Sequence, residues 1–176
     1  LAVTENQSGL EDWLAGHGLG FAPTLVLDPQ NAAFPVPVER QAGGYTVQET
    51  PLLNYPSFVD IRHDGMHRDS GLLTGIDQLS LTWASPVTVD AEKNRERRVV
   101  RLLESSPGSW TSPSFDIQPD FERYGETGFA TGTDTGRQLL GVLVEGRFDS
   151  PFRGQPSPLV FAVRRAEAER TKATSG

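Results

Sequence analysis

Two histidines and several aspartates gather in the segment 60–69, where the sequence comes closest to a metal site. His63 and His67 are four residues apart, and this spacing can place two imidazoles on one face of a helix. The carboxylates that could complete such a metal shell are Asp60, Asp64 and Asp69. Gly65 interrupts the interval, and the segment HDGMHRDSG has the composition of a polar loop, because Asp and Gly favour turns. We therefore predict no metal, and the candidate binding residues of this loop are Arg62, His63, Asp64 and His67.

Covalent hydrolysis would need a nucleophile with a base in reach, and the chain has no cysteine. A serine would have to serve, with His17, His63 or His67 as its base, but no serine sits in a G-x-S-x-G elbow. The glycine runs GHGLGF and GETGFATGTDTGR lack the spacing of a dinucleotide fingerprint and the lysine of a phosphate loop. We expect no enzymatic activity and no cofactor, while a hydrolase with an unrecognised set of residues stays open as an alternative.

A second candidate site lies in the segment 106–136, which is rich in Gly, Ser, Thr and Pro but carries five aromatic residues. Aromatics in such a stretch indicate an ordered loop that packs against the domain. Trp110 and Tyr124 stand near Asp116, Asp120 and further acids, a combination that also occurs in carbohydrate-binding modules. We name Trp110 and Tyr124 as candidate binding residues. The competing interpretation places the aromatics in the core and the acids in water.

The elements that would position these residues are mostly strands. The runs SFVDIR at 57–62 and SLTWAS at 80–85 predict two strands, with the polar loop and one or two helical turns at 72–79 between them. A short helix is expected at 9–16, followed by a strand at 24–28. Further predicted strands are 86–90, 99–105, 138–146 and 158–165. The segment 36–50 predicts a hairpin with a four-residue loop at 41–44.

Strands outnumber helices, which predicts a β-rich α+β fold; a three-layer α/β fold is the alternative. At 176 residues with 36% hydrophobic content, the chain suits one core, so we expect a single domain over 1–165 and a polar tail over 166–176. The net charge of −7 argues against a nucleic-acid partner, since phosphate binding needs a basic face.

The chain begins at Leu1 without a methionine and has no apolar run of membrane-spanning length. We therefore expect an excised part of a longer protein that meets a membrane only through segments absent from this chain.

The block NYPSFVDIRHDGMHRDSGLLTGIDQLSLTWASPV, at 54–87, resembles the extracytoplasmic domain of GldG-type auxiliary components of ABC transporters, known from gliding motility. In that family a "Yp.fv.vr.dg" segment precedes an "i..gl..l.l.waSp" segment. Three further segments look like family segments in the same order: SGLEDWLAGHGLGFAPTLVLDPQ, RLLESSPGSW and GVLVEGRFDSPFRGQPSP. The resemblance covers about 8–160, except for the polar loop and 111–137.

This resemblance implies the later part of a glutamine-amidotransferase-like α/β sandwich, on the periplasmic or extracytoplasmic face of a bacterial inner membrane. The implied partners are the ABC permease and ATPase subunits or another membrane protein. Our leading hypothesis is a non-catalytic domain that acts by protein contact or substrate handling. The alternatives are a carbohydrate or small-ligand binding module and the unrecognised hydrolase.

Overall fold

The computed structural model describes residues 9–35, 38–150 and 152–155 of the chain. The chain falls into two compact units, Leu1–Gly146 and Arg147–Gly176. In the second unit, the described residues form a turn in which Arg153 pairs with Asp149 at 2.8 Å. None of the helices in the described ranges has the length and apolar character needed to cross a membrane.

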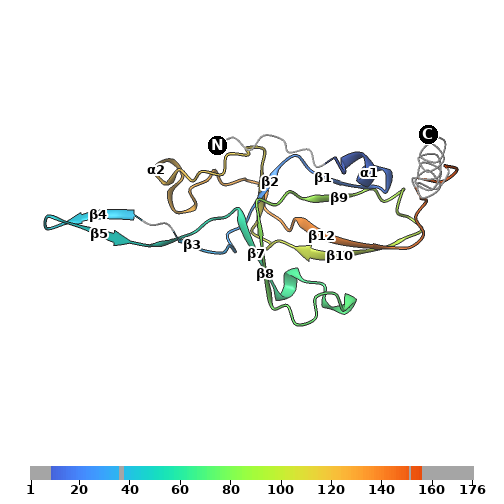
Figure 1. The fold of residues 1–176 in the computed structure, drawn as a ribbon, viewed down its shortest axis with the longest axis horizontal. Helices are drawn as coiled ribbons and strands as arrows, with labels where there is room; N and C mark the ends of the chain where they lie inside the picture. The colour runs from blue at the N-terminus through green and yellow to red at the C-terminus, as the bar shows by residue number, and fades with distance from the viewer. Residues whose placement is uncertain (1–8, 36–37, 151, 156–176) are drawn as a thin grey trace, which may run out of the picture. The chain divides into compact units, whose positions relative to one another are not determined.

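The first unit consists of short strands joined by loops and a few helical turns (Figure 1). The helical elements are α1 (Glu11–Gly16), α2 (Phe121–Tyr124) and the 3-10 turns η1 (His63–Gly65), η2 (Arg68–Ser70) and η3 (Gly125–Thr127). The first six strands are β1 (Leu19–Phe21), β2 (Leu25–Leu27), β3 (Phe34–Pro35), β4 (Val38–Ala42), β5 (Tyr45–Glu49) and β6 (Leu52–Leu53). The other strands are β7 (Phe58–Arg62), β8 (Gln78–Thr82), β9 (Val87–Val89), β10 (Arg98–Glu104), β11 (Trp110–Ser112) and β12 (Leu139–Glu145).

The strands pair two by two, and each ladder in the described part of the chain is antiparallel. The pairs are β1 with β9, β2 with β11, β3 with β6, β4 with β5, β7 with β8 and β10 with β12. The β-rich α+β fold is therefore confirmed. The parallel pairs that a three-layer α/β fold would need do not occur among these described strands.

The main core lies where β2, β7 and β10 meet. Val26, Val59 and Ile61 are almost completely buried, and they pack with Met66 and Leu103. The segment after β2 also contacts β7 through the backbone, since the amide of Ala32 donates to the carbonyl oxygen of Phe58 at 2.9 Å. The β-branched runs at 24–28 and 57–62 thus form the strands that the sequence predicts, because their side chains fill this core.

Two local predictions were wrong in detail. The hairpin at 36–50 exists, but its loop is the two-residue turn Gly43–Gly44, where φ is +58° and +83°. Such angles belong to a type I′ turn, which matches the twist of the flanking strands. The predicted helical turns at 72–79 are instead a turn and the start of β8. Leu79 pairs opposite Ile61, so the apolar spacing there serves a strand and not a helix face. The predicted strand at 158–165 lies outside the described residues.

Candidate functional site

The loop after β7 is held against β10. The amide of His67 donates to the carbonyl oxygen of Leu102 at 2.9 Å, and Met66 forms a bridge with Leu103. Gly65 is buried, and a Cβ at this position would lie 2.5 Å from the carbonyl oxygen of Glu104. This close approach explains the glycine in HDGMH. It is a packing requirement of the backbone.

His63 and His67 do not share a helix face. The 3-10 turn η1 ends at Gly65, and Met66 then has extended backbone with φ −119° and ψ 124°. The buried Met66 side chain lies between the two histidines in the chain. In the part of the chain that the structure describes, no three His, Cys, Asp or Glu residues form a group that could hold a metal ion. Neither of these two imidazoles hydrogen-bonds a serine hydroxyl there, so they form no nucleophile–base pair.

Arg62 pairs with Asp60 on the same strand. The Arg62 Nε donates to Asp60 Oδ2 at 2.7 Å, and the Arg62 side chain remains 52% exposed while the Asp60 side chain is buried. The other carboxylate oxygen, Oδ1, has no hydrogen-bond partner among the described residues. A buried carboxylate needs its counter-ion, because a lone charge is costly away from water. Arg62 therefore stabilises the protein itself through this pair.

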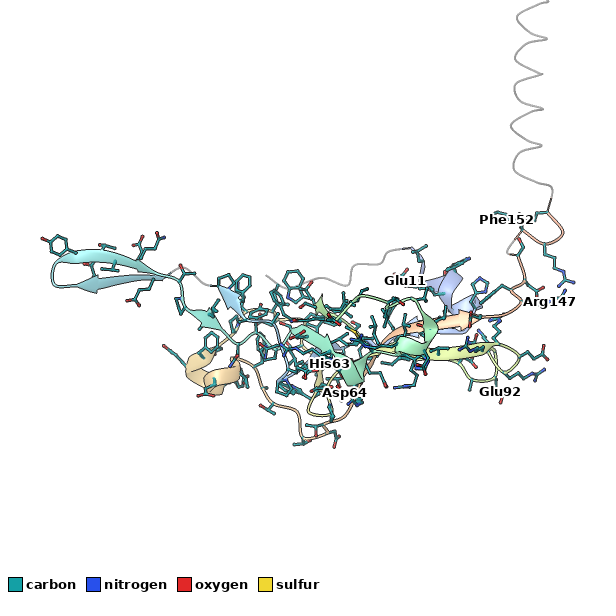
Figure 2. All side chains as sticks on the ribbon, turned by 90° about the horizontal axis from the view of Figure 1, so that it is seen from below. Glu11, His63, Asp64, Glu92, Arg147 and Phe152 are labelled. Atoms are coloured by element: carbon teal, nitrogen blue, oxygen red, sulfur yellow. The ribbon has the colours of Figure 1, made fainter. Side chains whose placement is uncertain are left out.

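Asp64 lies beside His63 on η1 (Figure 2). Its carboxylate pairs with Arg137, which lies two residues before β12. The Arg137 guanidinium also donates through Nη1 to the carbonyl oxygen of Ser105 at 3.0 Å, which fixes its direction. The hydrogen bond and the positive charge of Arg137 hold the pKa of Asp64 below its ordinary value. The pair links the polar loop to residues more than seventy positions away.

We expect an Arg137→Gln variant to raise the pKa of Asp64 toward the value of an unpaired aspartate. A lowered pKa means that the pair stabilises the fold above the unfolded pKa and that this contribution is lost as the pH falls through the folded pKa. NMR titration of the Asp64 carboxyl carbon measures the shift. Arg98→Gln is the control, because Arg98 pairs with Glu145 at 2.6 Å. An Asp64 pKa that is identical in wild type and Arg137→Gln would contradict the pairing.

Trp110 is a core residue. It is only 3% exposed and packs with Leu27 and Phe129 in a second buried cluster. Its indole N–H donates to the carbonyl oxygen of Ala130 at 3.0 Å, and Gly132 lies directly against its ring. This is the inward-facing arrangement that the competing interpretation of segment 106–136, the aromatic loop, predicted. Trp110 therefore offers no ring face to a soluble ligand.

Tyr124 lies on α2 and borders a pocket of about 170 Å³. Its ring is partly exposed, with the Arg123 guanidinium 5.1 Å from the ring centre. Asp120 caps α2 by accepting from the Arg123 amide at 3.0 Å. The other polar lining residues are Ser57, Ser112, Ser114, Asp116 and Gln118. The pocket therefore offers hydroxyl and carboxylate groups beside apolar side chains of β2.

Ser57 is the unusual member of this pocket lining. The residue is 1% exposed, and its hydroxyl has no hydrogen-bond partner among the described residues. Buried hydroxyls are normally paired, so an unpaired one calls for a specific explanation. Ser57 directly precedes β7, and the sequence contains no signal that distinguishes it from the other serines.

Sequence reasoning also missed a buried polar node at Asp28, which directly follows β2. The carboxylate is fully buried and accepts from the Gln30 amide at 2.8 Å, the Ser106 amide at 2.7 Å and the Ser106 hydroxyl at 2.6 Å. The only available signal was the position of an aspartate immediately after the apolar run LVL. Asp28 thereby ties the end of β2 to the turn after β10.

Two further serines extend this node. The hydroxyls of Ser105 and Ser109 lie 2.5 Å apart, and Ser109 donates to the carbonyl oxygen of Gly136 at 2.6 Å. Ser105 accepts from the Gln138 amide at 2.7 Å. The segments TLVLD and RLLESSPGSW, which carry the family resemblance, therefore meet at one network. Its hydroxyls are engaged in internal bonds, which is typical of a structural role.

An aromatic patch occupies the surface beside β7. We define it as Phe34, Tyr55, Phe58 and Trp83, whose neighbouring ring centres lie 4.6 to 5.8 Å apart. Trp83 is 47% exposed, and Phe34 is also exposed. Trp83 has φ +53°, a left-handed backbone conformation that costs a bulky residue about 1–2 kcal/mol. The structure therefore holds an exposed indole in a strained position.

An apolar groove of about 540 Å³ adjoins the patch. Its lining residues are Phe34, Leu53, Tyr55, Ile117, Gln118, Pro119 and Phe121. The Tyr55 hydroxyl donates to the carbonyl oxygen of Ile117, so the aromatic loop forms one side of the groove. Phe34 and Tyr55 belong to both the patch and the groove lining, so the two form one continuous apolar surface.

Comparison with known families gives one match. The family described as an ABC-type uncharacterized transport system matches residues 1–175, which is almost the whole chain. No protein of curated function and no solved structure matches the chain. The amidotransferase-like sandwich therefore stays a prediction. The chain belongs to the auxiliary family of ABC-type uncharacterized transport systems.

Proposed function

We propose that this chain is a non-catalytic, extracytoplasmic domain of a GldG-type ABC-transporter component, and that it works by binding other proteins of the transport system. The observation that carries the proposal is the aromatic patch with its groove. Exposed apolar surface of this kind marks protein-interaction sites, and Trp and Tyr contribute strongly to binding energy there. The direct partner would be the permease, at the periplasmic face of the membrane, or another membrane protein, and the ATPase subunit would be reached through the permease.

The polar residues support a binding role over hydrolysis. His63 and His67 lie on a loop that is packed against β10, and their neighbours Asp60 and Asp64 are engaged by arginines. The buried serines Ser105 and Ser109 hydrogen-bond each other, Ser109 also donates to a backbone carbonyl, and the Ser106 hydroxyl donates to the Asp28 carboxylate. A hydrolase would need an activated nucleophile with a base in hydrogen-bond reach. ATP hydrolysis would then reside in a separate subunit.

Copurification from bacterial membranes tests the proposal. The affinity-tagged protein should bring down an ABC permease and its ATPase, identified by mass spectrometry. Trp83→Ala should reduce their recovery by roughly tenfold, the effect of losing an interface side chain worth about 1.4 kcal/mol. Leu72→Ala is the matched control, because Leu72 is an exposed apolar residue outside the patch. Recovery of neither subunit, or equal loss in both variants, would refute the role of the patch.

A second candidate function is binding of a neutral polar ligand, favoured by the unpaired Ser57 hydroxyl in the small pocket. Monosaccharides such as glucose, galactose and N-acetylglucosamine are suitable probes, with the amide signals of Tyr124 and Gly128 as NMR reporters. Ser57→Ala should abolish the shifts while leaving thermal stability unchanged or slightly higher, since it removes an unpaired buried hydroxyl. If no sugar shifts these signals at millimolar concentration, this candidate is rejected.

A further inference from the structure

The β4–β5 hairpin is a two-stranded ribbon without a neighbouring strand in the described part of the chain (Figure 1). All residues of β5 are exposed, and Tyr45 reaches 78% exposure. A two-stranded ribbon with no core of its own is only marginally stable in water, and additional strands stabilise it. The hairpin therefore has the surface of an incomplete sheet.

The two faces of β5 differ in chemistry. Side chains alternate along a strand, so Tyr45, Val47 and Glu49 lie on one face, while Thr46 and Gln48 lie on the other. On the polar face, the Gln41 side chain donates to the Thr46 hydroxyl at 2.8 Å. On the opposite face, both Tyr45 and Val47 are exposed. An aromatic and a β-branched residue in adjacent positions on one face suit a broader sheet.

The pairing register shows which backbone groups point outward. A two-residue turn closes on a hydrogen-bonded pair, here Ala42 with Tyr45, and bonded and non-bonded pairs then alternate. The pairs of Gln41 with Thr46 and of Glu39 with Gln48 are therefore non-bonded, so the amides and carbonyls of Thr46 and Gln48 face away from β4. They form the free edge of β5.

This edge lacks the usual protection of natural edge strands. Such strands are commonly blocked by proline, lysine, inward-pointing charges or bulges. The stretch from Tyr45 to Gln48 contains no proline and no charged residue, and its pairing with β4 is regular from end to end. Regular edges of this kind accept a further antiparallel strand.

We propose that β5 pairs with β5 of a second copy of this chain, giving a continuous four-stranded sheet across a two-fold axis. With Val47 opposite Val47 of the second copy, Thr46 lies opposite Gln48 of the second copy, and the reverse pair follows by symmetry. Both residues present outward-facing groups, so each pair can exchange two backbone hydrogen bonds. The exposed Tyr45 and Val47 side chains of the two copies then share one face.

The sequence of β5 favours a second copy as the partner. In this register the opposing pairs are Val with Val, Thr with Gln, and Tyr with Glu, so no like charges meet. The corresponding pairing of two β4 edges would place Arg40 of one copy opposite Arg40 of the other, which is destabilising. The self-pairing edge is therefore β5. The aromatic patch is not part of this interface.

Sedimentation of the purified protein tests the proposal. The wild type should show a concentration-dependent monomer–dimer equilibrium, and Thr46→Pro should weaken it on the order of tenfold or more, because proline removes an outward donor from each copy. Gln41→Pro is the matched control: it blocks the outer edge of β4 and also loses the Gln41–Thr46 bond. It should leave the dimer intact. A wild type that stays monomeric at millimolar concentration, or equal weakening by both variants, would overturn the proposal.

Cross-linking gives an independent test that does not depend on the proline variants folding. The chain has no cysteine, so Val47→Cys introduces a single thiol. Opposite Cβ atoms in a sheet lie about 4.5–5.5 Å apart, and non-bonded pairs such as this one lie at the short end of that range, which a disulfide can span after a small adjustment. Oxidation should give covalent dimers at least about tenfold faster than with Tyr45→Cys. In this register residue 45 of one copy lies opposite residue 49 of the other, so the two thiols of Tyr45→Cys are about four positions apart along the strands. Equal rates for the two variants would reject this register.

Discussion

Asp28→Ala is expected to lower the free energy of unfolding by about 3–5 kcal/mol, because it removes three hydrogen bonds from a buried carboxylate. The amides of Gln30 and Ser106 and the Ser106 hydroxyl would lose their acceptor. The bond to Ser106 spans 78 positions of the chain, so its loss would also release the end of β2 from the turn after β10. The effect should therefore exceed that of an ordinary surface substitution.

Denaturant unfolding followed by far-UV circular dichroism measures this change. Asp116→Ala is the matched control, since Asp116 is exposed and accepts a bond from the amide of Gln118 at 3.0 Å. We expect that control to change the unfolding free energy by less than about 1 kcal/mol. Equal effects of the two substitutions would show that the Asp28 network does not hold β2.

Trp110→Ala should destabilise the fold by about 3–5 kcal/mol, the range for removing a large buried aromatic side chain. The substitution would empty the space between Leu27 and Phe129 and leave the carbonyl oxygen of Ala130 without its donor. Trp110→Phe keeps most of the ring but loses the indole bond, so it should cost less. This order separates packing from hydrogen bonding.

The same denaturation experiment applies to Trp110, with Trp83→Ala as the control. Trp83 is about half exposed, and replacing it leaves the buried contacts of Trp110 on β11 in place. We expect a loss of about 1 kcal/mol or less for Trp83→Ala. A small effect of Trp110→Ala, comparable to that of Trp83→Ala, would mean that Trp110 does not support the core and would restore it as a candidate ligand platform.

Most of the strands could be predicted from local residue patterns alone. The runs around Val26, Val59 and Leu103 are rich in β-branched and aliphatic residues, which favour strands. These residues are also buried in the core, so local propensity and tertiary packing agree there. The β-prone runs on both sides of 41–44 likewise predicted the hairpin, although its turn is only Gly43–Gly44. The candidate site was predictable only in part: His63 and Asp64 lie on the expected polar loop, but sequence spacing contains no information on which arginine neutralises which aspartate.

The direction of the aromatic side chains and the partners of the buried polar groups depend on the folded arrangement of distant segments. Trp110 turned inward because Gly132 allows its ring to approach the backbone, and Leu79 joined a strand because Ile61 lies opposite it. Asp28 found Ser106 across a long chain interval. Each outcome depends on contacts between distant segments, and such contacts override local patterns when they bury apolar area or satisfy a charge.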